Sequence, residues 1–159
     1  MRAEKKSFLR DVALLSAAVC CLAAGAAAPA AAQSLEPRQA IEKARALERD
    51  GRLDDAYVFL HELVQTDEEL ARNASVLMEL SRLSPTTDES VKLLERVATM
   101  TRDGAIVASA RGQLGDYLYA RGSYLEAAEQ FLLAAERAPS HRRGDYMLQH
   151  AASVLAAGD

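Results

Sequence analysis

The chain has 159 residues and a formal net charge of −4, and it is 50% hydrophobic, 26% charged and only 5% aromatic. Its length allows one domain, or one domain with a targeting segment. Charges of both signs exclude a wholly membrane-embedded protein. The lack of a basic block beyond the first ten residues argues against a nucleic-acid partner.

The first segment has the pattern of a secretory signal peptide. Basic residues precede an uncharged, alanine-rich stretch from Val12 to Ala32, which ends in three alanines before Gln33. We therefore predict a signal peptide at 1–32, cleaved after Ala32, and an acidic domain at 33–159 that is periplasmic, in a bacterial envelope, or secreted. The alternative is an uncleaved anchor, because the apolar stretch is about long enough to span a bilayer.

The rest of the chain has apolar residues at helical spacing and no strand pattern. Three hydroxyl residues precede a Glu by three positions, as in a capping box: Thr66, Thr86 and Ser123. The pattern predicts about seven helices, and their short joins favour antiparallel neighbours in an all-α fold. The expected helices are 36–50, 52–65, 67–83, 87–101, 105–121, 124–137 and 142–157.

The chain repeats part of its own pattern. Gly51–Ala56 and Gly122–Ala127 both read glycine, a polar residue, a large apolar residue, two variable residues and alanine. Repetition at intervals of a few tens of residues indicates stacked helix pairs, none of which buries its apolar face alone. The second copy lies in a stretch marked by Leu114, Gly115, Ala127, Phe131 and Pro139.

On these residues the chain resembles the tetratricopeptide repeat (TPR) family. It departs from the family motif at Arg111, where the family has Trp, and at Leu118, where it has Tyr. The resemblance implies a short right-handed solenoid of antiparallel helix pairs. The implied units are about 37–70, 71–107 and 108–141, followed by a capping helix at 142–157.

The resemblance also implies positions at which small residues let helix axes approach to about 8 Å. The first helix of a pair would meet the second at Ala44, Gly115 and Ala151. The implied structural positions of the repeat are Ala44, Gly51, Ala56, Gly115, Gly122, Ala127, Phe131 and Pro139.

In the TPR family the first helix of each pair lines a concave groove, which implies a binding surface here. The matching positions are Arg38, Ile41, Arg45, Arg49, Asn73, Asp116 and Tyr119. Arg38, Arg45 and Arg49 share one helix face and would form a positive binding strip. The same spacing also fits a solvated face with ion pairs between turns, Glu42 included, and both alternatives stay open.

No motif points to catalysis, and His61, His141 and His150 lack metal-ligand spacing. We expect no enzyme activity, no metal and no cofactor. The predicted function is an exported scaffold or adaptor that binds a protein or peptide segment in the groove. A membrane would be a partner only if the signal segment is kept. The alternatives are a membrane-tethered envelope assembly factor and a non-catalytic subunit of a periplasmic enzyme complex.

Overall fold

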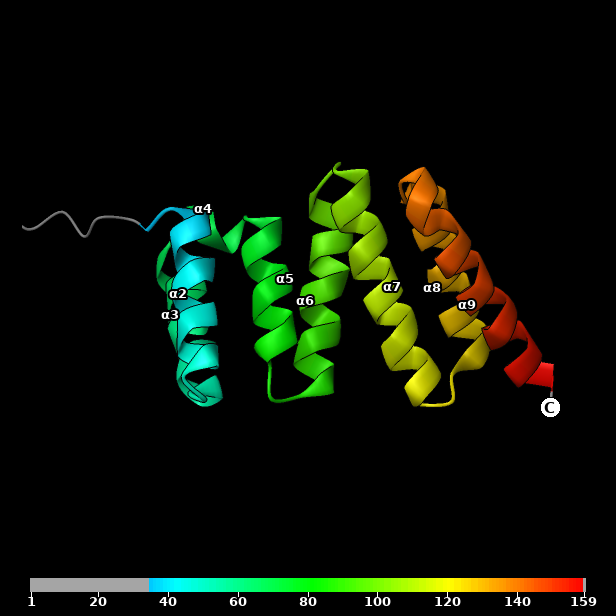
Figure 1. Cartoon of the computed structure of the whole chain (residues 1–159), viewed down its shortest axis with the longest axis horizontal. Helices are drawn as coiled ribbons and strands as arrows, with labels where there is room; N and C mark the ends of the chain where they lie inside the picture. The colour runs from blue at the N-terminus through cyan, green and yellow to red at the C-terminus, as the bar shows by residue number, and fades with distance from the viewer. Residues whose placement is uncertain (1–34, 159) are drawn as a thin grey trace, which may run out of the picture. The chain divides into compact units, whose positions relative to one another are not determined.

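The structure, a computed structural model, describes residues 35–158, which contain only helices and their connections (Figure 1). The all-α prediction is therefore confirmed for this range, and the predicted signal peptide lies outside it. The eight helices between residues 35 and 158 are α2 (Pro37–Arg49), α3 (Leu53–Thr66), α4 (Glu68–Ala71), α5 (Ala74–Leu83), α6 (Thr87–Met100), α7 (Gly104–Ala120), α8 (Tyr124–Arg137) and α9 (Ser140–Gly158).

The helix expected at 67–83 is divided into α4 and α5, so the prediction of seven helices is wrong by one. Asn73 begins α5, because its Oδ1 accepts hydrogen bonds from two backbone N–H groups of the first turn, both at 3.1 Å. Asp67 caps α4 in the same way, at 2.9 and 3.2 Å. Asn and Asp bond to nearby backbone groups more readily than they continue a helix, so each starts a new one.

The three expected capping residues behave differently from one another. Thr86 Oγ1 accepts a hydrogen bond from the N–H of Glu89 at 3.4 Å. Thr66 instead donates to a carbonyl oxygen one turn earlier, at 2.9 Å, because Asp67 occupies the cap position. Ser123 makes no side-chain cap hydrogen bond. The sequence pattern was therefore wrong about Thr66 and Ser123.

Two glycines end α2 and α7 with the same turn. Gly51 has a φ of 77° and Gly122 a φ of 80°, a region that side chains other than glycine rarely adopt. In each turn the N–H of the following residue bonds back to a carbonyl oxygen of the helix, at 2.9 Å after Gly51 and 3.0 Å after Gly122. The turns leave short joins to α3 and α8.

Small residues lie where helices contact one another. Ala44, Ala56 and Ala127 are fully buried, and Phe131 is buried beside Ala127. Ala151 is exposed, because no helix between residues 35 and 158 covers that face of α9. The expectation that Ala151 is a close-contact position is therefore wrong.

Each long helix contacts the next long helix along the chain within residues 35–158, and this includes α3 and α5, between which the short α4 lies. Contacts also join helices that are not consecutive. α5 contacts α2, α3 and α7, so α2, α5 and α7 share one neighbourhood although α3 and α6 separate them in sequence. This neighbourhood positions the candidate site.

Candidate functional site

A pocket of about 500 Å³ lies along α2, α5 and α7. Its apolar lining includes Ile41 of α2, Met78 of α5 and Ile106 of α7. All three side chains are half-buried and pack against the main core cluster, which holds them in place from behind. The pocket can therefore offer apolar contacts without a large change in the core.

A second pocket, of about 330 Å³, continues along α7 to α9. Ser109 and Gln113 of α7 line both pockets, so the two adjoin. We call the two pockets together the groove. The side chains of Ser109 and Gln113 make no hydrogen bond to any residue in 35–158, which leaves their polar groups able to bond to a bound molecule.

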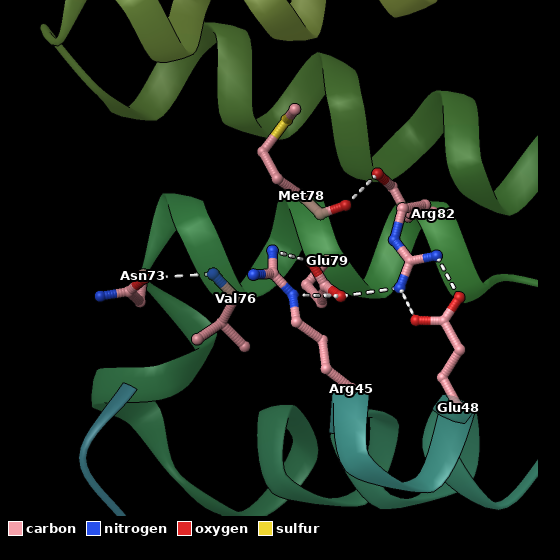
Figure 2. A network of polar contacts seen from close by, with 8 residues as sticks. Arg45, Glu48, Asn73, Val76, Met78, Glu79 and Arg82 are labelled. Atoms are coloured by element: carbon pink, nitrogen blue, oxygen red, sulfur yellow. Dashed lines mark hydrogen bonds and ion pairs between the residues drawn. The ribbon is translucent and has the colours of Figure 1, made fainter. Parts of the chain in front are cut away.

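Four charged residues form a network between α2 and α5, and three of them line the groove (Figure 2). Glu79 of α5 accepts two hydrogen bonds from Arg45 of α2, at 3.0 and 3.2 Å. Arg82 donates to Glu79 at 2.8 Å and to both carboxylate oxygens of Glu48, at 2.7 and 2.5 Å. Two guanidinium groups are thus held by two carboxylates, and the network has no net charge.

Glu79 is the centre of this network. Its side chain is only 6% exposed, whereas that of Arg45 is 58% exposed. Burial alone raises the pKa of Glu79, but the hydrogen bonds from Arg45 and Arg82 outweigh burial and hold the pKa below its ordinary value. A hydrogen bond from Arg82 likewise lowers the pKa of Glu48. Both carboxylates are therefore ionised at neutral pH.

The network has a regular sequence separation. Arg45 and Glu79 are 34 residues apart, and so are Glu48 and Arg82. Both contacts join α2 to α5, so successive turns of the two helices face each other in a constant register. A three-residue step from 45 to 48 on one helix is matched by the same step from 79 to 82 on the other.

The α9 end of the groove depends on a glycine. A Cβ on Gly112 would lie 2.4 Å from Cε1 of Tyr146, so only glycine lets the Tyr146 ring lie against α7 at this point. Near it, Gln149 donates to Asp116 at 3.4 Å. Partial burial raises the pKa of Asp116. This end of the groove thus presents two carboxylates, a guanidinium group, amides and a phenol, because Asp145 and Arg142 also line it.

The groove brings together only some of the residues expected to line it. Ile41, Arg45 and Asp116 line it, and Arg45 is bound to Glu79 rather than free. The other four expected positions, Arg38, Arg49, Asn73 and Tyr119, are not among its lining residues.

Those four residues have other surroundings. Arg38 is 90% exposed and pairs with Glu42 on its own helix, at 3.2 Å. Arg49 is exposed near the end of α2, and Asn73 caps α5. Tyr119 is 41% exposed and packs edge-on against Tyr124, with ring centroids 5.0 Å apart. Of the three arginines predicted to share a face of α2, Arg45 lines the groove, and it is ion-paired with Glu79.

Sequence reasoning missed Met78, Glu79 and Arg82, all on α5. The unit that contains them has few signature residues, so its groove-facing positions could not be assigned by the family motif. A step of 34 residues from Arg45 and Glu48 leads to Glu79 and Arg82, with the charges reversed. That charge complementarity at the repeat spacing was the available signal.

The histidines lie apart from one another. His61 of α3 packs near Tyr57, with ring centroids 5.4 Å apart, His141 is exposed, and His150 Nδ1 lies 2.9 Å from the carbonyl oxygen of Ala128. Among residues 35–158, no three His, Cys, Asp or Glu side chains are grouped as a metal site would require.

No helix in the same range has both the length and the apolar character needed to cross a membrane.

Compared with known proteins, the chain matches no model of a protein family and no curated protein.

Proposed function

We propose that the domain is a short TPR-like solenoid of antiparallel helix pairs that binds a segment of a protein partner in the groove, without catalysis. The groove carries this proposal, because it extends along helices from three or more successive units and combines apolar and unpaired polar side chains. Such a surface suits a polypeptide better than a compact ligand, since a peptide offers apolar side chains and backbone groups in alternation.

The chemistry of the groove indicates how the segment would be held. Ile41, Met78 and Ile106 would accept apolar side chains. Ser109 and Gln113 would bond to backbone N–H or C=O groups of the segment. The Arg45–Glu79 pair would contribute little attraction of its own, because each charge already has a partner within the protein. This pair should therefore add little salt dependence to binding.

The regular contacts between α2 and α5 support the solenoid part of the proposal. Both contacts span 34 residues, which is the length of one TPR unit. The glycine turns after α2 and α7 have the same geometry, which supports the proposal that each of these helices is the first of its pair.

We further propose that the domain acts outside the cytoplasm, in the periplasm or as a secreted protein, because residues 1–32 have the signal-peptide pattern. A membrane-tethered assembly factor and an accessory subunit of an envelope enzyme would use the same groove.

The groove can be tested by blocking and by cross-linking. Ser109 lies where the two pockets adjoin, so Ser109→Trp should fill the groove without removing a core side chain. A photoreactive residue at Gln113 should form an adduct with one polypeptide of the envelope fraction, and Ser109→Trp should abolish that adduct. Thr99→Trp, at an exposed position on α6, is the matched control and should leave the adduct unchanged.

The adduct should be identified by mass spectrometry of the cross-linked peptide, and helix content should be compared by circular dichroism. An adduct that persists in Ser109→Trp, or one lost equally in both Trp variants, would count against the groove.

A further inference from the structure

A separate pocket of about 470 Å³ lies beside the join between α6 and α7, and α8 forms its other side. Three arginines line it: Arg102 of the join, Arg111 of α7 and Arg137 of α8. We call this pocket the arginine pocket. Its lining residues on α7, which include Gly104 and Arg111, lie on the opposite helix face from Ser109 and Gln113. The arginine pocket is thus distinct from the groove.

The three arginines have no carboxylate partner between residues 35 and 158. None of them forms an ion pair there, although Arg45 and Arg82 do. Arg111 donates one hydrogen bond, to Oε1 of Gln130 at 2.7 Å, which leaves most of its N–H groups available. Arg102 and Arg137 are exposed and make no side-chain hydrogen bond within the described residues.

Negative charge near the arginine pocket is too small to balance them. Glu136 is the one carboxylate residue in its lining. Asp103, next to Arg102 in sequence, adds a second negative charge nearby, but it is not among the lining residues, and its Oδ1 is directed at the N–H groups of Ala105 and Ile106, where it caps α7. The pocket therefore concentrates positive charge in a protein whose net charge is −4. Like charges placed together repel, and a bound anion would remove that repulsion.

We propose that the arginine pocket binds a small molecule with two or more carboxylate or phosphate groups. A guanidinium group presents a planar set of N–H donors that matches the oxygens of both groups. Three such groups can hold more than one anionic group at once. The volume lies in the range of about 300–1,000 Å³ that small-molecule sites have, and it exceeds what a single small ion would fill.

Isothermal titration calorimetry with citrate and with inorganic pyrophosphate tests this site, at constant ionic strength. We expect saturable binding of at least one probe, with a Kd below about 1 mM. Binding of citrate alone would assign carboxylates as the ligand class, and binding of pyrophosphate alone would assign phosphates. If neither probe binds saturably, the proposal is overturned.

Three variants locate the bound anion. Arg111→Gln and Arg137→Gln should each weaken binding at least about tenfold, because each removes a charge-assisted contact. Arg72→Gln removes the same charge from an exposed residue of the α4–α5 join that pairs with Glu68, and it should leave the Kd unchanged. Arg137 is exposed, so its variant should fold even if Arg111→Gln is destabilised. Equal weakening in Arg137→Gln and Arg72→Gln would mean a general charge effect and would overturn the assignment.

Discussion

Gly115 of α7 lies directly against the ring of Phe131 of α8. A Cβ on Gly115 would come within 2.6 Å of Cε1, 2.7 Å of Cζ and 2.8 Å of Cδ1 of that ring. Phe131 is only 2% exposed, so other residues enclose the ring. The absence of a side chain at position 115 is what allows α7 and α8 to pack this closely.

Gly115→Ala should therefore destabilise the protein. Alanine favours a helix interior over glycine by about 1 kcal/mol, but overpacking a filled core costs about 1–3 kcal/mol. We expect a net loss of up to about 2 kcal/mol in the free energy of unfolding, measured by urea denaturation. The Phe131→Leu background, with a smaller side chain, should relieve most of that loss.

Gly144→Ala is the matched control for this substitution. Gly144 lies in α9, and a Cβ there would meet nothing within 4 Å. Only the greater helix propensity of alanine over glycine then affects stability, so Gly144→Ala should stabilise the protein by up to about 1 kcal/mol. If Gly115→Ala stabilised the protein equally, the close contact with Phe131 would be wrong.

The sequence was a good guide to which residues are helical and a poorer guide to where helices divide. Apolar spacing of three and four residues reports the buried face directly, so the all-α class followed from it. The division of the expected helix at Asn73 did not follow from the spacing, because apolar residues on both sides of Asn73 keep the helical spacing. The helix breaks there because the side chain of Asn73 bonds to nearby backbone N–H groups. The spacing of apolar residues carries no information about such a hydrogen bond.

The groove was predictable only where the family motif had matching residues. Ile41 and Asp116 were assigned on that basis, whereas Glu79 and Arg82 lie in the stretch with the weakest resemblance. The partner of Arg45 was not identified from the sequence, because Glu79 is 34 residues away. Pairing across helices follows from packing, which a single helix face does not reveal.

Asn73→Ala should show that the cap at α5 contributes to stability. Replacing an Asn cap by Ala typically costs about 1 kcal/mol, because two backbone N–H groups lose their acceptor. Ser123→Ala should cost much less, since Ser123 makes no side-chain cap hydrogen bond at α8. Thermal unfolding of both variants checks the difference, and equal shifts in Tm would contradict the assignment of Asn73 as a cap.

Ala127 and Ala157 provide a second matched pair. Ala127 is fully buried on α8, whereas Ala157 is exposed near the end of α9. Ala127→Leu should overpack the α8 contact and lower the free energy of unfolding by about 1–3 kcal/mol. Ala157→Leu should have little effect. Denaturant titration of the two variants measures this, and similar losses would show that burial at 127 does not govern packing there.

Glu79→Gln should destabilise the protein at neutral pH. The neutral amide keeps the shape of Glu79 but loses its charge, so Arg45 and Arg82 no longer bond to an ionised acceptor at position 79. Hydrogen bonds to charged groups contribute about 1.5–3 kcal/mol, and removal of part of that stabilisation is expected. Glu42→Gln, in the exposed pair with Arg38, should cost far less because surface ion pairs contribute little.

The difference between wild type and Glu79→Gln should depend on pH in a set direction. The pKa of Glu79 is below the ordinary value of a glutamate side chain, because hydrogen bonds from Arg45 and Arg82 overcome the effect of burial. A group with a lowered folded-state pKa adds stability above its unfolded-state pKa and loses it as the pH falls through the folded-state pKa. The wild-type advantage should therefore be constant from about pH 6 to 8 and shrink below about pH 4.5. Urea denaturation of both proteins across this range measures it. An advantage that grew on acidification would mean that Glu79 is protonated more readily in the folded protein, and the network would then not stabilise its charge.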